Sequence, residues 1–206
     1  MTETAKDGRV ARGIRTREAV IDTLFELYAE GNLTPTIEQI ADRIGRTTRA
    51  IYQHFQDKEA LAAAMAKRQL ELHRELFEAH PISGGRTKRI DGIVAHRAEL
   101  FETVAPARRS ALVRMHASPE LQAQQTYFAE HFRRQLVRTF EPELTALSSK
   151  AMTRNGTGQQ AAGELLELLD LHTSWDTWER LRTWQSLPVE RSRQLVTRLV
   201  TQALRR

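Results

Sequence analysis

Cysteine is absent from the 206 residues of this chain, so the sequence offers no disulfide framework, no thiolate nucleophile and no cysteine ligand for a metal ion. No apolar run approaches the roughly 18 residues that would predict a membrane span. Residues 1–17 are polar and lack the apolar stretch of a secretory signal. These absences predict a cytoplasmic protein without a membrane partner, and the 40% hydrophobic content is ample for a packed core.

The chain also has little excess of either charge. The formal net charge is +5, which is only a weak indication of an acidic partner. Residues 1–60 carry nine basic and ten acidic side chains, so total charge does not locate a site. Basic residues nevertheless gather near the N-terminus (Lys6, Arg9, Arg12, Arg15, Arg17) and around Gly45 (Arg43, Arg46, Arg49). The first group is either a solvated, disordered tail or an arm that contacts phosphates.

Alternating strand patterns and fixed-period repeats are missing as well, and helical periodicity replaces them. The fold class is therefore predicted to be all-α, with about nine helices. Helices are expected over residues 16–29, 37–44, 48–55, 58–79, 87–104, 106–116, 119–140, 159–185 and 188–204, with a mobile loop at 141–158. Residues 1–57 and 58–206 are expected to form two domains, and the helix over 58–79 is expected to connect them.

The stretch from Thr34 to Leu61 has two short helices around one tight turn. Thr36 and Gln39 have the spacing of a capping box, and Gly45 supplies the positive φ of a helix end. Thr47 or Thr48 can cap the second helix. On that helix Ile51 and Phe55 are expected to face inward. Thr48, Arg49, Tyr52 and Gln53 are left on the outer face, which is how a chain presents a recognition helix to the major groove of DNA.

The same stretch resembles the N-terminal signature of the TetR family of transcriptional regulators over about residues 15–65. The resemblance rests on Ile40-Ala41, Gly45, Thr47, Ile51-Tyr52, His54-Phe55 and Lys58-Glu59-Ala60-Leu61. Two positions depart from the family pattern, because Arg46 replaces a small apolar residue and Arg49 replaces a glycine. Arg46 either lays its stem over the turn or reaches DNA itself. Both changes add positive charge and make the base preference of relatives a poor guide.

The resemblance implies a three-helix DNA-binding domain that is followed by a helical domain for effector binding and dimerisation. It places Tyr52, His54 and the amine or helix N-terminal amides around Lys58 on phosphates. Arg17 is expected to reach the flanking backbone. Base readout is assigned to Thr47, Thr48, Arg49 and Gln53. Thr36 and Arg46 complete the predicted DNA-binding set. Tyr52 is alternatively half-buried, and His54 is alternatively a plain surface residue.

Two apolar stripes near the C-terminus, on the helices expected over 159–185 and 188–204, predict a homodimer through a four-helix bundle. Alternatively, both stripes serve only the core of the chain. The family resemblance further implies a small-molecule effector pocket within residues 87–181. Its candidate lining residues are aromatic, apolar or histidine side chains: His96, Phe101, Leu112, Met115, His116, Tyr127, Phe128 and Trp175. Each of these is alternatively an ordinary core residue.

The leading interpretation is a dimeric DNA-binding repressor that binds a palindromic operator in double-stranded DNA and is released by a small molecule. An enzyme is disfavoured, because no nucleophile elbow, glycine-rich phosphate loop or metal-binding histidine spacing occurs in the sequence. No cofactor and no metal are therefore expected. The alternative is a non-sequence-specific DNA-binding protein without an effector. Such a protein would contact only the DNA backbone and would therefore bind a random duplex as tightly as any other at the same salt concentration.

Overall fold

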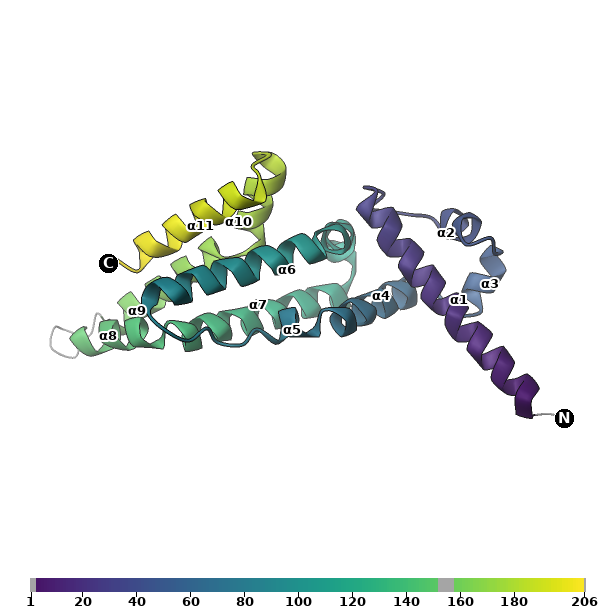
Figure 1. Ribbon diagram of the computed structural model, residues 1–206, viewed down its shortest axis with the longest axis horizontal. Coiled ribbons are helices and arrows are strands. Elements are labelled where there is room, and N and C mark those ends of the chain that lie inside the picture. Colours follow the sequence, from purple (N-terminus) through teal and green to yellow (C-terminus); the bar gives the residue numbers. More distant parts are fainter. Residues whose placement is uncertain (1–2, 152–157, 206) are drawn as a thin grey trace. The chain divides into compact units, whose positions relative to one another are not determined.

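The computed structural model describes residues 3–151 and 158–205, and that part of the chain is helical without any strand (Figure 1). None of its helices is both long enough and apolar enough to cross a membrane. The elements in chain order are α1 (Glu3–Ala29), α2 (Ile37–Arg43), α3 (Thr48–Tyr52), α4 (Lys58–Leu72), α5 (Arg74–Glu78), α6 (Arg86–Arg114), η1 (Met115–Ala117), α7 (Pro119–Thr139), α8 (Glu141–Ala151), α9 (Gly158–His172), α10 (Trp175–Glu179), η2 (Arg180–Trp184) and α11 (Val189–Ala203).

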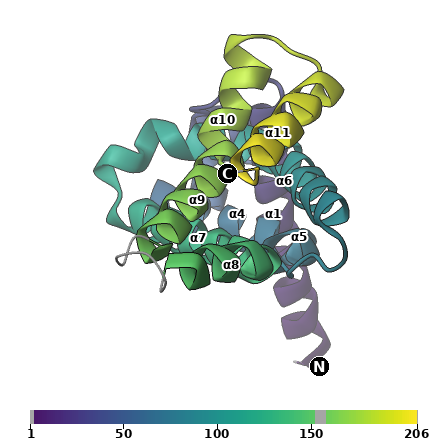
Figure 2. The same ribbon diagram turned by 90° about the vertical axis from the view of Figure 1, so that its left-hand side faces the viewer.

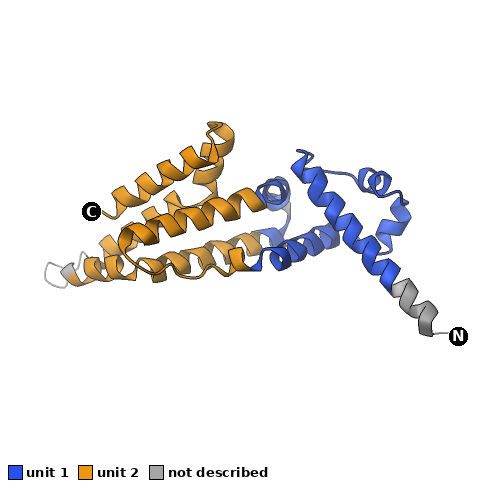
Figure 3. Ribbon diagram, viewed as in Figure 1, with its two compact units in different colours: residues 1–74, 104–121 blue, residues 75–103, 122–206 orange. Residues whose placement is uncertain are grey.

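The chain divides into two compact units, which Figure 3 distinguishes by colour. Unit 1 consists of Met1–Arg74 and Val104–Leu121, and unit 2 consists of Glu75–Thr103 and Gln122–Arg206. Unit 1 is therefore larger than the first domain expected from the sequence, because α4 packs on α1 and a second segment joins them. The boundary between residues 57 and 58 stays a prediction about function and does not coincide with a boundary of packing.

Unit 1 is built around one apolar core that α1, α2, α3 and α4 share. The apolar residues that helical periodicity places on one face of these helices are buried, and those buried most completely include Val20, Ile40 and Ile51. Leu72, the last residue of α4, is by contrast 52% exposed. The reason is that α4 ends at Leu72 and α5 restarts after His73, which interrupts the predicted register.

Unit 2 is a bundle in which α6, α7, α9 and α11 lie alongside one another (Figures 1 and 2). Its core contains Leu100, Leu136, Leu169 and Val200, each at most 1% exposed. Polar side chains fasten the helices at two places. The Arg89 guanidinium, which is almost fully buried, donates to Glu143 in two hydrogen bonds of 2.7 Å and to the carbonyl of Thr139 at 2.8 Å.

The second set of hydrogen bonds lies further along α6, at Glu102. Glu102 accepts a hydrogen bond from the Trp178 indole at 2.8 Å and two from the guanidinium of Arg182 at 2.8 and 3.0 Å. The pKa of Arg182 is raised, mainly by its hydrogen bonds to Glu102. Both fastenings satisfy polar groups that packing would otherwise leave unpaired, and such groups are costly when buried alone.

Besides the break of the helix expected over 58–79 into α4 and α5, four expectations about the helices are wrong. The helix expected from residue 16 begins at Glu3, because Ala and Arg favour a helix more strongly than Gly8 and Gly13 oppose it. The helices expected over 87–104 and 106–116 are one helix, α6, with Pro106 inside it. Since Pro106 has no N–H, it removes one helical hydrogen bond, but the helix resumes on both sides.

The other two errors concern the C-terminal half. The segment expected as a mobile loop over 141–158 contains α8, and residues 152–157 lie outside the described residues. Acidic residues in the first turn favour that helix, and Leu144 and Leu147 pack its inner side. The helix expected over 159–185 is interrupted after His172, because the Ser174 hydroxyl caps a new helix by accepting the N–H of Thr177 at 3.2 Å.

Candidate nucleic-acid interface

The helix pair α2 and α3 forms a helix-turn-helix whose ends are fixed by local hydrogen bonds. The capping box at the start of α2 is present as predicted. The N–H of Gln39 donates to the Thr36 hydroxyl at 3.2 Å, and the N–H of Thr36 donates to the Gln39 side chain at 2.9 Å. These bonds satisfy two N–H groups that a helix end otherwise leaves open. The Thr36 hydroxyl therefore caps α2, and its predicted contact with DNA would come in addition to that structural role.

The turn depends on Gly45, which has a φ of +62°. This left-handed conformation costs a residue with a Cβ more than it costs glycine. The N–H of Arg46 returns to the carbonyl of Ala41 at 2.9 Å and closes the end of α2. Thr47 then caps α3, since its hydroxyl accepts the N–H of Ala50 at 3.2 Å. The sequence had left the cap open between Thr47 and its neighbour, Thr48.

The recognition helix α3 has one buried side and one exposed side. Ile51 is fully buried and Phe55 is 3% exposed, as predicted. Arg49, Tyr52 and Gln53 lie on the opposite, exposed side. The Tyr52 side chain is 50% exposed, and its contact with a phosphate stays a prediction. Thr48, which was predicted to face outward, is half-buried.

Arg17 fastens α1 to the end of the recognition helix. Its guanidinium donates to the backbone carbonyl of His54 at 3.1 Å and lies 4.6 Å from the centre of the Phe55 ring. A guanidinium over an aromatic face is attracted to the π electrons of the ring. Arg17 was predicted to reach the DNA backbone. In the structure its side chain holds α3 against α1, and the contact with DNA stays a prediction.

An open groove lies between α1 and the helix-turn-helix. Its wall carries the cations Arg12, Arg15 and Arg46, together with Gln53 and His54. The His54 ring is close to α1, because a Cβ at Gly13 would lie 3.5 Å from its Cε1 atom. Basic side chains along such a groove attract the phosphate backbone of a nucleic acid. The exposed Arg46 belongs to this wall, which supports its DNA-contacting interpretation.

Arg12 and Arg15 were missing from the predicted set of DNA-binding residues. The signal for them was present in the sequence, since the basic residues of the first segment recur at intervals of three. That spacing places Arg12 and Arg15 on neighbouring positions of one helix face. The spacing has this consequence only because α1 extends back to Glu3, so that residues 12 and 15 are helical.

The basic cluster at the turn is smaller than the sequence indicates. Arg43 forms an ion pair with Glu30 at the end of α1, so that its charge is compensated within the protein. Arg46 and Arg49, by contrast, are exposed. Two cations, and not three, therefore remain on the reading side of the turn.

The start of α4 differs in one respect from the expected phosphate site. The Asp57 carboxylate caps the helix by accepting the N–H of Ala60 at 2.7 Å. That amide is therefore not available to a phosphate, and a negative charge stands beside it. The exposed Lys58 ammonium stays the predicted contact of this helix end.

The eight predicted effector-binding residues do not belong to one unit. Leu112, Met115 and His116 lie in unit 1, and the others lie in unit 2. In unit 2, Phe101 and Trp175 are buried and pack edge to face with ring centres 5.6 Å apart. Such an edge-to-face contact is typical of two aromatic residues in a hydrophobic core. The placement of the eight residues therefore does not indicate a single pocket that all of them line.

The remaining predicted residues of unit 2 join an aromatic cluster on α5, α6 and α7. Phe128 packs against Phe77 at 5.1 Å and stacks on Phe132 at 6.0 Å. Tyr127 packs edge to face on Phe128, but is itself exposed. His96 contacts Phe132 edge to face and bonds to the carbonyl of Leu76 through Nε2 at 2.9 Å. Both ring nitrogens of the half-buried His96 therefore have partners within the protein.

Burial, and next the neighbouring Arg97, lower the pKa of His96 to about 4. The imidazole is consequently neutral near pH 7. Burial also lowers the pKa of Arg97 to about 10, against the opposing effect of Asp170. The Arg97 guanidinium lies 4.4 Å from the centre of the Phe132 ring, which offsets part of the cost of burying a cation. Throughout residues 3–151 and 158–205, no group of three acidic or histidine side chains has the arrangement of a metal site.

Known proteins resemble the part of the chain that contains this interface. Residues 20–65 match the family described as bacterial regulatory proteins, tetR family. The uncharacterized HTH-type transcriptional regulator TtgW of Pseudomonas putida is 41% identical over 61 residues. The match covers 29% of this chain and 46% of that protein, which is less than half of its length. No solved structure matches the chain. We conclude that residues 20–65 carry the helix-turn-helix domain of the tetR family of bacterial regulatory proteins.

Proposed function

We propose that this chain is a non-enzymatic transcriptional regulator, acting as a repressor, that binds a palindromic operator as a dimer. The observation that carries this proposal is the recognition helix α3. Its inner side is anchored by the buried Ile51, and its outer side presents Arg49, Tyr52 and Gln53. Arginine pairs with guanine and glutamine pairs with adenine in the major groove, so this outer side has the chemistry for reading bases.

The phosphate contacts of the proposed complex come from the surrounding elements. Arg12, Arg15 and Arg46 line the groove beside α3, and Lys58 lies at the start of α4. Such contacts fix the orientation of the protein on the duplex and make binding depend on salt. Base contacts of α3 then add sequence preference to a docking geometry that is already set.

A dimer is proposed because one short recognition helix reads too few bases for useful affinity. Part of the apolar stripe on α11 packs inside the chain itself, since Val196 and Val200 are buried in unit 2. The neighbouring edge of α11 carries Leu195 and Leu199, which are half-buried. The exposed Leu171 of α9 supplies a further apolar side chain. These three leucines are what a partner copy would cover.

Release by a small molecule is the part of the proposal that rests on the family resemblance. The molecule must bind one conformation more tightly than the other, because equal affinity for both would shift nothing. Bound operator must then weaken the binding of the molecule by the same factor. Calorimetric titration of a compound with and without operator DNA measures that factor directly.

The experiment that tests the proposed function compares two substitutions on α3. Arg49→Ala should cost about 1–3 kcal/mol on the best sequence and relax base preference at one position of each half-site. Tyr52→Phe should weaken binding to all sequences about equally. Arg43→Ala is the matched control, because its charge is paired with Glu30 outside the reading side. Equal loss on specific and random duplexes for Arg49→Ala would instead support a non-sequence-specific DNA-binding protein.

A further inference from the structure

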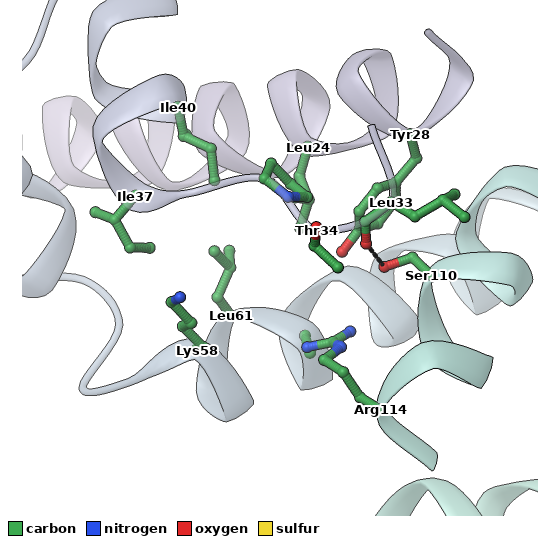
Figure 4. A pocket seen from close by; sticks show the side chains of 12 residues that line it. Leu24, Tyr28, Leu33, Thr34, Ile37, Ile40, Lys58, Leu61, Ser110 and Arg114 are labelled. Carbon is green, nitrogen blue, oxygen red and sulfur yellow. Dashed lines mark hydrogen bonds between the residues drawn. The ribbon is translucent and has the colours of Figure 1, made fainter. Parts of the chain in front are cut away.

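Unit 1 contains a cavity of about 210 Å³ behind the helix-turn-helix (Figure 4). Leu24 and Tyr28 of α1, Ile40 of α2 and Leu61 of α4 line it with apolar surface. The segment from Leu33 to Pro35, which leads into α2, forms part of the wall. The wall is held in place on one side by Ser110, whose hydroxyl donates to the carbonyl of Leu33 at 2.8 Å.

Two cations enter this otherwise apolar cavity, and the residues that line it include no acid. Figure 4 shows Lys58 and Arg114 rising from their helices on the side of the cavity opposite Leu24 and Tyr28. The Nε atom of Arg114 is buried and, among the described residues, has no hydrogen-bond partner. Glu38 is the acid close enough to Lys58 to interact with it, so Arg114 is the less compensated of the two cations.

Size and charge together define a ligand class. An engineered apolar cavity of about 150 Å³ accommodates benzene, so a cavity of about 210 Å³ has room for one ring with a short side arm. Arg114 is half-buried, with its Nε atom inaccessible, and a guanidinium so placed favours a planar carboxylate, because its N–H groups match the two carboxylate oxygens. We propose that this cavity binds a small aromatic monocarboxylate, with its ring among the leucine and isoleucine side chains and its carboxylate on Arg114.

Such a ligand would act on DNA binding within unit 1 itself, which differs from an effector pocket among the residues of the C-terminal half. A carboxylate between Arg114 and Lys58 competes with phosphate for the Lys58 ammonium. The ring contacts Ile40 of α2 and the chain that leads into α2. This consequence for DNA rests on the proposed function, whereas binding of the ligand does not.

Binding is tested on the full-length protein without DNA. Phenylacetate is the probe, and phenylacetamide is its neutral counterpart of the same shape. Calorimetric titration should give a dissociation constant at least tenfold lower for phenylacetate. Arg114→Met keeps the apolar stem of the side chain and removes the charge, so it should abolish the preference for the anion. Arg198→Met is the matched control, since Arg198 is exposed on α11 and lies outside the lining, and it should leave the preference unchanged.

A second variant keeps both cations and fills the space. Ala62 lines the cavity, so that Ala62→Phe should abolish binding of phenylacetate while circular dichroism shows a folded protein. Retention of the tenfold preference in Arg114→Met would overturn the proposal. So would undiminished binding in Ala62→Phe, or equal affinity of the wild type for acid and amide. Titration in the presence of operator DNA then measures the coupling separately, and its failure would leave the binding site intact while refuting the effect on DNA.

Discussion

Replacing Arg17 with alanine should weaken DNA binding without changing its salt dependence. The side chain holds the recognition helix in two ways, through the carbonyl of His54 at 3.1 Å and through the face of Phe55 at 4.6 Å. A partly exposed cation over an aromatic ring contributes about 0.5–1 kcal/mol. The hydrogen bond from a charged donor adds about 1 kcal/mol at this exposed position. Their sum of about 1.5–2 kcal/mol corresponds to a loss of roughly 10- to 30-fold in affinity.

Salt separates this structural role from a direct phosphate contact. A lysine or arginine that contacts a phosphate contributes about one unit to the slope of log K against log salt, because it releases a counterion. We therefore expect Arg17→Ala to lower affinity with the slope unchanged. Arg15→Ala, on the wall of the basic groove, should lower the slope. Fluorescence anisotropy on a labelled duplex at several salt concentrations measures both quantities.

Folding supplies the second half of the test. If Arg17 positions α3, the alanine variant must also lose unfolding free energy in urea, by up to about the same 1.5–2 kcal/mol. Arg17→Lys keeps the charge but loses the planar stacking, so it should recover only part of both losses. A reduced salt slope with unchanged stability would refute the reasoning and restore the predicted phosphate contact.

Three further predictions follow from individual contacts. Thr47→Ala should destabilise unit 1 by about 1 kcal/mol through the lost cap of α3, whereas Thr48→Ala should not, and thermal unfolding compares the two. The pKa of His96 is lowered to about 4, so its contribution to stability is fully present above about pH 6.5 and is lost as pH falls toward 4. His96→Gln should flatten that part of the stability–pH profile measured by denaturation, and an unaltered profile would assign the pH dependence to other groups. Replacing Leu195 and Leu199 with glutamate should convert a dimer of about twice 23.6 kDa, measured by light scattering, into a monomer, and a monomeric wild type at micromolar concentration would contradict the dimer.

The helix-turn-helix could be predicted residue by residue because its determinants are local. The capping box of Thr36 and Gln39, the positive φ of Gly45 and the inward pair Ile51 and Phe55 each depend on neighbours within five residues. Short-range chemistry of this kind is visible in a sequence. The same holds for the all-α fold class, which follows from helical periodicity.

Long-range packing decided what the sequence could not. Pro106 has every local reason to begin a helix, yet packing continues α6 through it. Residues 141–151 have the composition of a loop, yet they form α8 because their apolar side chains have a surface to cover. The pairing of Arg43 with Glu30 likewise joins residues from two helices, so that its removal from the basic cluster was not predictable.

The cavity near Arg114 shows the same limit for ligand sites. Residues from α1, α2, α4 and α6 meet there, and no spacing within the sequence connects them. The predicted effector set was chosen by residue type, and type alone does not bring side chains together. Local chemistry therefore indicated the surface that we propose for DNA binding, whereas only the structure located a cavity.

The sequence that the protein selects from a pool of random duplexes tests the central claim most directly. The account predicts a palindrome with half-sites about 34–36 Å apart, or a multiple of that distance, as expected when a two-fold dimer places one α3 in each major groove. It also predicts that the Arg49→Ala protein selects a palindrome with one relaxed position in each half. Retention of duplexes without any shared sequence, at the same salt concentration, would contradict the assignment of α3 as a helix that reads bases.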